Sequence, residues 1–421
     1  MTIEAPLADA LEWLFRTRAP AAVETKAREV MLDTFGCALA ARRHPEVAAY
    51  GKALEAADPG SVSSAASYFA AAACWDEACE GLARAHGRPG LAVLAACSAL
   101  SRVKPHSMQE VVAAYLAGYE VGGRMGESLR IAPGMHVDGA WPAFGVAAAV
   151  VKLLGGRATQ ALAAIRIAAC QMPYSLYLPI AQGASARNVY LSHASQLGML
   201  AASAALGGIV APQGALEELR SRALAAAPQG APLAPPGEWL IAETYLKPYA
   251  AVRHVHYGAA AAIALRPKLA GRLNDISRVR LATYAEALTY CGNRAPRSAI
   301  QAQFSLSYGV ACALATGELV PDSYALQLLR NPEITRLEEM TELAEDTSLT
   351  RAGKRGAALV VELDGRKFEH AVERVTGDPS MPMARAELLA KFASYSGLAP
   401  AKGEEFLEAP GDGRFIPLSS P

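Results

Sequence analysis

The 421-residue sequence carries little charge and no net excess of either sign. Its 40 Lys and Arg residues balance 40 Asp and Glu residues, and charged residues make up only 19% of the chain. No run of Lys or Arg is suited to following a phosphate backbone, so we expect no nucleic-acid partner. The 52% of hydrophobic residues is enough for a large core and predicts more than one domain.

Long apolar runs and an export signal are also missing. Segments such as "WPAFGVAAAVVKLLGG" (141–156) are too short and too rich in alanine to span a bilayer, which needs about 20 strongly apolar residues. The opening "MTIEAPLADALEWLFRTRAP" has early acidic residues and is typical of an amphipathic helix rather than a signal peptide. The seven cysteines form no CxxC pair, which favours reduced core residues over disulfides or metal ligands. We therefore expect a cytoplasmic protein that has no membrane association and no metal site.

The residues that are present indicate a helical first half followed by a mixed region. Apolar positions with helical spacing recur from "VETKAREVMLDTFGCAL" (23–39) to "SHASQLGMLAASAAL" (192–206), which predicts a stack of helices. The Pro-rich "APQGAPLAPPGEW" (227–239) suits a linker or a surface loop. Beyond residue 245, "ISRVRLATYAEAL" has a strand-like pattern, and "ALVVELDGRKFEHAVERV" has two alternating runs around Asp364-Gly365, which predict a hairpin. The later "MARAELLAKFASYSG" predicts a helix that stops at Gly397.

Several stretches, in this order, resemble the MmgE/PrpD family, which includes 2-methylcitrate dehydratase, cis-aconitate decarboxylase and iminodisuccinate epimerase. The matching stretches are "MLDTFGCALAA", "GYEVGGRM", "GMHVDGAWPAFGVAAAVVKLLGG", "ARNVYLSHASQLGMLAA", "KPYAAVRHVHYGAAAA", "QFSLSYGVACALATGEL" and "GDPSMPM" with "ELLAKF". The resemblance implies a mainly α fold with a smaller α/β (α+β) lid: an all-helical domain from residues 1–245 and 383–421, and a lid domain from residues 246–382. It further implies a homodimer with the active site in the cleft between the domains, and neither an organic cofactor nor a metal.

Three residues are candidate catalytic groups on the resemblance. Family members remove a proton from a carbon next to a carboxylate, and this chemistry needs a base that titrates near neutral pH and cations that hold carboxylates. His256 matches the family histidine at the start of the lid, His136 falls in the family's "HP" segment, and Tyr308 matches a tyrosine that faces the substrate. The alternatives are a helix-capping His256 in the core, a packed His136 beside Asp138 as a helix N-cap, and a Tyr308 that only packs.

The candidate substrate-binding residues are Arg187, Arg88, His86, Asp76 and Arg253. Arg187 matches a lysine of the decarboxylases and offers a planar fork for a carboxylate. At the lid edge Arg253 would either clamp a carboxylate or lie in solvent.

The stretch "CWDEACEGLARAHGRPG" departs from the family pattern of "DxDDT" followed by "HP[SG]G". Asp76 matches the first aspartate, but Arg88 stands where the family has histidine. Either His86 takes the vacated place or Arg88 binds an additional carboxylate. Because an arginine does not exchange protons near neutral pH, the chemistry of a standard methylcitrate dehydratase is in doubt.

Our leading hypothesis is a cofactor-independent lyase that removes the proton alpha to a carboxylate of a small di- or tricarboxylic acid, by dehydration or decarboxylation. An isomerase or epimerase, or a cyclising enzyme of a specialised pathway, is the alternative on the same scaffold. A relative that binds a carboxylate without catalysis is the alternative from another class.

Overall fold

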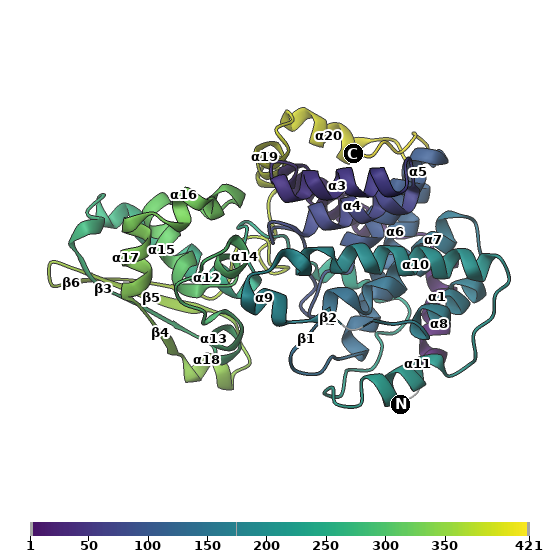
Figure 1. Ribbon diagram of the computed structural model, residues 1–421, viewed down its shortest axis with the longest axis horizontal. Helices are drawn as coiled ribbons and strands as arrows, with labels where there is room; N and C mark the ends of the chain where they lie inside the picture. Colours follow the sequence, from purple (N-terminus) through teal and green to yellow (C-terminus); the bar gives the residue numbers. More distant parts are fainter. Residues whose placement is uncertain (1–2, 174, 419–421) are drawn as a thin grey trace.

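The computed structural model describes residues 3–173 and 175–418, which form two bodies placed side by side (Figure 1). The larger body is helical, and both the first and the last helices of the chain belong to it. Its helices are α1 (Glu4–Arg16), α2 (Ala21–Ala41), α3 (Pro45–Ala57), α4 (Val62–Cys74), α5 (Leu91–Val103), α6 (Met108–Ser128), α7 (Pro142–Leu153), α8 (Ala158–Ala169), α9 (Leu178–Gln182), α10 (Tyr190–Leu206), α11 (Ala215–Glu218), α19 (Arg385–Ser396) and α20 (Pro400–Glu408).

Small residues set how closely these helices pack. Where α6 crosses α7, a Cβ added at Gly118 would lie 2.7 Å from the carbonyl oxygen of Gly145. Only glycine allows the two backbones to approach this far. At the start of α6, Ser107 and Glu110 form a capping box that satisfies two backbone N–H groups. The alanine-rich helical stack expected from the sequence is confirmed.

The smaller body is built around a four-stranded sheet with the order β4-β3-β5-β6. Strands β3 and β4 are parallel, and the other pairs are antiparallel. The strands are β3 (Ile276–Thr283), β4 (Thr341–Glu345), β5 (Ala357–Leu363) and β6 (Arg366–Val372), and the helices of this body are α12 (His256–Leu265), α13 (Ala285–Cys291), α14 (Ala299–Gln303), α15 (Leu306–Thr316), α16 (Leu326–Leu329), α17 (Pro332–Met340) and α18 (Thr347–Arg351). Strand β5 alternates between buried and half-buried residues, so one face of the sheet packs against helices.

Two turns expected from the sequence are confirmed. Asp364 and Gly365 connect β5 to β6 with φ angles of 50° and 70°, the left-handed pair that a two-residue hairpin turn needs. Gly397 ends α19 with a φ of 73°, which satisfies the last helical carbonyl groups without a steric penalty.

The Pro-rich stretch before the second body is a loop fixed to the helical body. The buried guanidinium of Arg124 donates to the carbonyl oxygens of Ala234 (3.0 Å), Pro235 (3.1 Å) and Glu238 (2.7 Å). These bonds hold the loop in one place, and of the two expectations, a linker or a surface loop, the structure shows the surface loop. Pro228 and Gln229 of the same loop reach the cavity described below.

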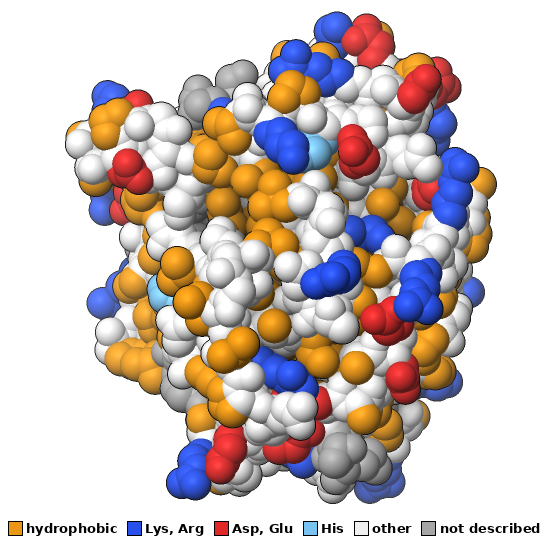
Figure 2. All heavy atoms as spheres, turned by 90° about the vertical axis from the view of Figure 1, so that its right-hand side faces the viewer, with side chains coloured by type: hydrophobic (Ala, Val, Ile, Leu, Met, Phe, Trp, Pro, Cys, Tyr) orange, Lys and Arg blue, Asp and Glu red, His pale blue; other side chains and the backbone are white. Residues whose placement is uncertain are grey.

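The far end of the helical body carries a mixed surface. Figure 2 shows hydrophobic side chains spread across the middle of this face, with basic and acidic side chains more frequent along its edges. Exposed apolar side chains of this body include Leu200 on α10 and Ile209 and Val210 just after it. No helix among the described residues combines the length and the apolar character needed to cross a membrane.

Candidate active site

A cavity of about 440 Å³ is lined by residues of both bodies. The helical body contributes the loop between α4 and α5, the end of α6 and the segment around His136, and the smaller body contributes residues from Arg253 to Arg355. Among the described lining residues, five side chains are cationic and three are acidic. The cations are Arg88, Arg130, Lys247, Arg253 and Arg355, and the acids are Glu77, Asp138 and Glu286. This surplus of positive charge suits an anionic ligand.

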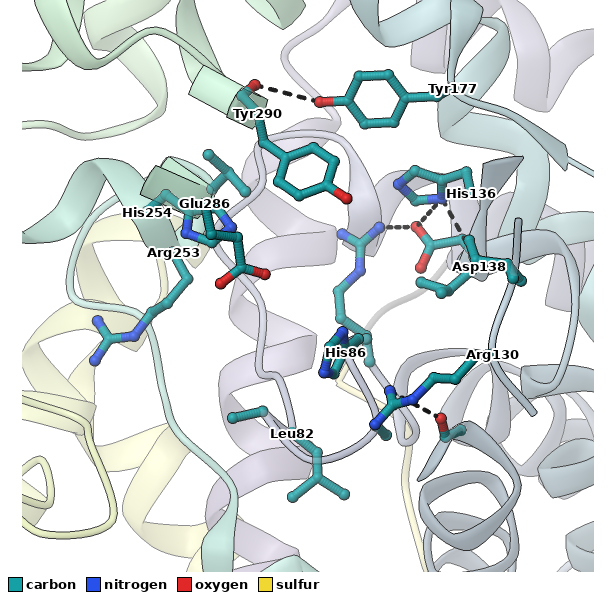
Figure 3. Close-up of a pocket in the computed structure, with 18 of the residues that line it drawn as sticks. Leu82, His86, Arg130, His136, Asp138, Tyr177, Arg253, His254, Glu286 and Tyr290 are labelled. Carbon is teal, nitrogen blue, oxygen red and sulfur yellow. Dashed lines mark hydrogen bonds and ion pairs between the residues drawn. The ribbon is translucent and has the colours of Figure 1, made fainter. Parts of the chain in front are cut away.

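Three histidines line the same cavity: His86, His136 and His254 (Figure 3). Aromatic rings connect two of them across the boundary between the bodies. His136 stacks on Tyr177 with ring centroids 6.3 Å apart, Tyr177 lies 5.9 Å from Tyr290, and Tyr290 stacks on His254 at 6.0 Å. In Figure 3 the hydroxyl of Tyr290 points into the space between His86 and His136.

His136 is held by its own backbone. It lies in the short strand β1 (Met135–His136), which pairs with β2 (Ser175–Leu176). Its Nδ1 accepts a hydrogen bond from the backbone N–H of Asp138 at 3.2 Å, so in the neutral ring the proton is on Nε2. Burial, offset in part by Asp138, lowers the pKa of His136 to about 4. His136 is therefore a neutral hydrogen-bond donor at pH 7. His136 thereby caps the 3₁₀ helix Val137–Gly139. Asp138 does not cap the following helix α7, whose N-cap residue is Trp141.

His86 occupies the cavity mouth, where it is exposed, in a left-handed backbone conformation with a φ of 54°. The surrounding protein, followed by the charges of Arg130 and Arg355, lowers the pKa of its ring to about 4. Arg130 donates to the carbonyl oxygens of Gly126 and Arg84, both at 3.3 Å. Arg355 lies 3.8 Å from the carboxylate of Glu286. Among the described residues, neither arginine has a carboxylate within 3.5 Å.

The inner end of the cavity contrasts with this mouth, because its cations already hold acids. Arg88 pairs with Glu77 at 3.0 Å and with Asp138. Arg187 and Lys247 also pair with Glu77. Burial raises the pKa of Glu77, but these three cations outweigh it, and the net result is a pKa well below the ordinary value. Both acids are ionised at neutral pH.

Several predicted residues line this cavity and others do not. His136, Arg88, His86 and Arg253 line it. Arg253 is directed away from the centre in Figure 3, since its guanidinium pairs with Asp378. That partner distinguishes it from the solvated arginine that was one of the two expectations.

The remaining predicted residues lie outside the lining. Arg187 is 1% exposed and reaches the cavity only through Glu77. Asp76 is turned to the opposite side of the loop, where it accepts from the ring of His44 at 2.7 Å. The hydroxyl of Tyr308 donates to the carbonyl oxygen of Ser323 at 2.6 Å.

His256 is fully buried behind the cavity. Its Nε2 lies 3.0 Å from the carbonyl oxygen of Ala251, and its Nδ1 lies 3.2 Å from the guanidinium of Arg253. The carbonyl needs a donor and the guanidinium is one, so Nε2 carries the proton and Nδ1 accepts. Burial and the charges of Arg253 and Lys247 lower the pKa of His256 well below the ordinary value. Both nitrogens are occupied, and neither is left for a substrate.

The lining also contains residues that were not among the candidates from the sequence. They include Glu77, Lys247, Arg130, Arg355, Tyr177 and Tyr290. Lys247 lies inside the quoted stretch "KPYAAVRHVHYGAAAA", and Glu77 directly follows Asp76, so both were within reach of the motif analysis. Arg130 and Arg355 lie in no motif, and only the fold brings them together.

The described part of the chain contains no group of three or more His, Cys, Asp or Glu residues placed to hold a metal ion. A search of curated proteins finds no match to the chain. Two family models match it: the MmgE/PrpD N-terminal domain over residues 6–226 and the MmgE/PrpD C-terminal domain over residues 249–408. Most of the lining residues lie within these matches, and Lys247 lies in the short interval between them. The chain belongs to the MmgE/PrpD family.

Proposed function

We propose that this protein is a cofactor-independent enzyme that removes a proton from the carbon next to a carboxylate of a small dicarboxylic or tricarboxylic acid. Membership of a family that includes dehydratases supports the class of reaction. The observation that carries the proposal is the cavity mouth, which His86 lines together with Arg130 and Arg355, two arginines with no carboxylate of the described residues within 3.5 Å. A lyase reaction is our first choice: either the electron pair left by the proton expels hydroxide as water, or carbon dioxide is lost and the proton is returned to carbon.

In this proposal Arg130 and Arg355 bind the substrate carboxylate, and His86 accepts the proton from the neighbouring carbon. Burial, followed by the charges of Arg130 and Arg355, lowers the pKa of His86 to about 4. A bound carboxylate offsets their charge, and so raises the basicity of His86 when a substrate is present. Substrate binding thus shifts the pKa of His86 toward the working pH, where general-base catalysis is most efficient.

His136 and Tyr290 supply donors on the other side of the space. The Nε2–H of a neutral imidazole and a phenol hydroxyl can both stabilise negative charge that develops on the substrate. Neither donor requires a charged acid, which also suits an isomerase or epimerase that returns the proton to carbon. His256 and Tyr308 have no catalytic part in the proposal, because a protein carbonyl oxygen already accepts from each.

The proposal is tested by proton NMR of the purified protein in deuterium oxide with cis-aconitate, 2-methylcitrate, citrate and iminodisuccinate. We expect enzyme-dependent exchange of a carbon-bound proton, with or without product. The His86→Asn variant should lose about 10²–10⁴-fold in rate and keep its circular dichroism spectrum.

The matched control is His193→Asn, which changes an exposed histidine on α10 and should exchange at the wild-type rate. Exchange that survives intact in His86→Asn would remove His86 as the base. A wild-type protein that binds these acids but exchanges no proton would favour the non-catalytic relative. The homodimer and the cytoplasmic location stay predictions.

A further inference from the structure

The carboxylate of Glu77 is surrounded by three cations at the inner end of the cavity. Its Oε1 accepts from Arg88 at 3.0 Å and from Arg187, and its Oε2 accepts from Lys247 at 2.8 Å. The residue is 4% exposed, yet it lines the cavity. The cations come from three separate parts of the chain: the loop after α4, the 3₁₀ helix Ser185–Val189 and the segment before α12.

The backbone of Glu77 is also unusual. Its φ of 53° is one of five positive values among the described non-glycine residues, and such a conformation persists in a non-glycine residue when the surroundings enforce it. Lys247 contributes to this by donating to the Glu77 carbonyl oxygen at 2.8 Å as well as to the side chain. The turn directs Glu77 into the cavity, while the preceding Asp76 pairs with His44 on the other side.

Three converging cations exceed what one buried carboxylate needs for neutrality. Arg88 also pairs with Asp138, so three cations and two acids leave a positive charge at this end of the cavity. Guanidinium and ammonium groups that contact one carboxylate from several directions are typical of a site for an anionic ligand. Here the ligand position is filled by a side chain of the protein.

We propose that Glu77 is a built-in carboxylate that occupies an anion subsite, and that it thereby restricts the substrate to acids whose carboxylates fit the outer end of the cavity. The part that concerns the substrate rests on the proposed function. The subsite itself is independent of catalysis. An acid with one more carboxylate is excluded because Glu77 fills the space and neutralises the cations that would bind it.

The direct test replaces Glu77 with glycine and supplies a small carboxylate. Glycine adopts a positive φ without penalty, so Glu77→Gly removes the carboxylate and suits the backbone of the turn. We expect formate to raise the Tm of Glu77→Gly in a saturable way, by at least about 2–4 °C, relative to chloride at the same ionic strength. The wild type and Glu286→Ala, in which formate can meet only the arginines of the mouth, should show a clearly smaller rise, because neither protein opens the position that three cations enclose.

If Glu77→Gly does not fold, the same comparison is made by refolding it in formate and in chloride. Recovery in formate alone supports the proposal. Equal recovery in both salts, recovery in neither, or a Tm that ignores formate overturns it.

Substrate restriction is tested by calorimetric titration with glutarate and tricarballylate, which differ by one carboxylate. In Glu77→Gly the affinity for tricarballylate relative to glutarate should rise at least tenfold over the wild type. Glu77→Gln removes the charge but keeps the space filled, so it should leave this ratio within about threefold of wild type. An unchanged ratio in Glu77→Gly, or an equal rise in Glu77→Gln, overturns the restriction.

The outcomes also separate this proposal from the proposed function. A formate response in Glu77→Gly together with no proton exchange by the wild type would retain the subsite and reject the enzyme. Proton exchange by the wild type without a formate response would retain the enzyme and reject the subsite.

Discussion

The two ends of the cavity use the same residue types in different ways. At the inner end Arg88, Arg187 and Lys247 are each paired with buried acids of the protein. Among the described residues, Arg130 at the mouth donates only to backbone carbonyl oxygens, and Arg355 has a carboxylate no nearer than 3.8 Å. An arginine in a cavity is therefore not by itself a substrate anchor. Its existing partner decides whether it is available.

The histidines support the same contrast. His256 is the residue that the family pattern favoured, but both of its ring nitrogens are occupied by the protein. The imidazole of His86 makes no hydrogen bond to the described residues, and it lines the cavity together with Arg130 and Arg355, whose charges act on it. A ring nitrogen without a hydrogen-bond partner in the protein, rather than position in a motif, distinguishes the histidine that can act on a ligand.

The largest expected effect is a loss of folding stability when a cation at the inner end of the cavity is removed. Arg88→Met removes one cation from a fully buried network and leaves Glu77 and Asp138 short of a partner. Removal of one partner of a buried ion pair costs about 3–5 kcal/mol, and we expect the free energy of unfolding to fall by this amount. Urea denaturation measures it. A loss below about 1 kcal/mol would mean that the inner network does not stabilise the fold. The proposed difference between the two ends of the cavity would then be wrong.

The second effect is a loss of stability in acid that His136 causes. Its pKa is about 4 in the folded protein and about 6.5 when unfolded, so its contribution is complete above pH 6.5 and is lost as the pH falls toward 4. The shift corresponds to about 3 kcal/mol at pH 4. We expect the difference in unfolding free energy between pH 7 and pH 4 to shrink by about this amount in His136→Gln. The same pH dependence in variant and wild type would show that His136 is not held neutral.

At the mouth we expect the opposite outcome to that of Arg88. Arg130→Met removes charge-assisted hydrogen bonds to a ligand, worth about 1.5–3 kcal/mol, which corresponds to a fall in kcat/KM of about 10–100-fold. Its unfolding free energy should change by less than about 1 kcal/mol. The control is Arg280→Met on an exposed position of β3, which should leave both quantities unchanged. A stability loss in Arg130→Met as large as that in Arg88→Met would remove the distinction between the ends.

Sequence patterns predicted the elements of this fold well because those patterns are local. The hairpin at Asp364-Gly365 and the helix end at Gly397 depend on residues that are adjacent in the chain. The same is true of the amphipathic helix α1. The Pro-rich stretch was expected as a linker or a surface loop, but its attachment was not predictable, because it depends on Arg124, a residue about 110 positions away.

The candidate site was harder to predict for the same reason. Resemblance located the right segments, and His136, His86, Arg88 and Arg253 all line the cavity. It could not tell which of them already bind the protein, because Arg88 meets Asp138 and Arg253 meets Asp378 across 50 and 125 positions of sequence. Arg130 and Arg355 carried no local signal, since the fold alone brings them to His86.

The smallest expected effect concerns the pair that Asp76 forms on the other side of its loop. Burial lowers the pKa of His44, but the hydrogen bond and charge of Asp76 raise it further, so the net pKa is above the ordinary value. The pair therefore stabilises the fold fully below about pH 6.5, and its contribution disappears as the pH rises through the raised pKa.

This sign is opposite to that of His136, which makes the two histidines an internal comparison. Because His44 is partly exposed, we expect His44→Gln to lower the unfolding free energy by no more than about 1 kcal/mol at pH 6, and by less at pH 8.5. Urea titrations at the two pH values measure this. A larger deficit at pH 8.5 than at pH 6 would mean that Asp76 binds a neutral ring. Asp76 would then stabilise the fold through packing and a neutral hydrogen bond, without an ion pair to His44.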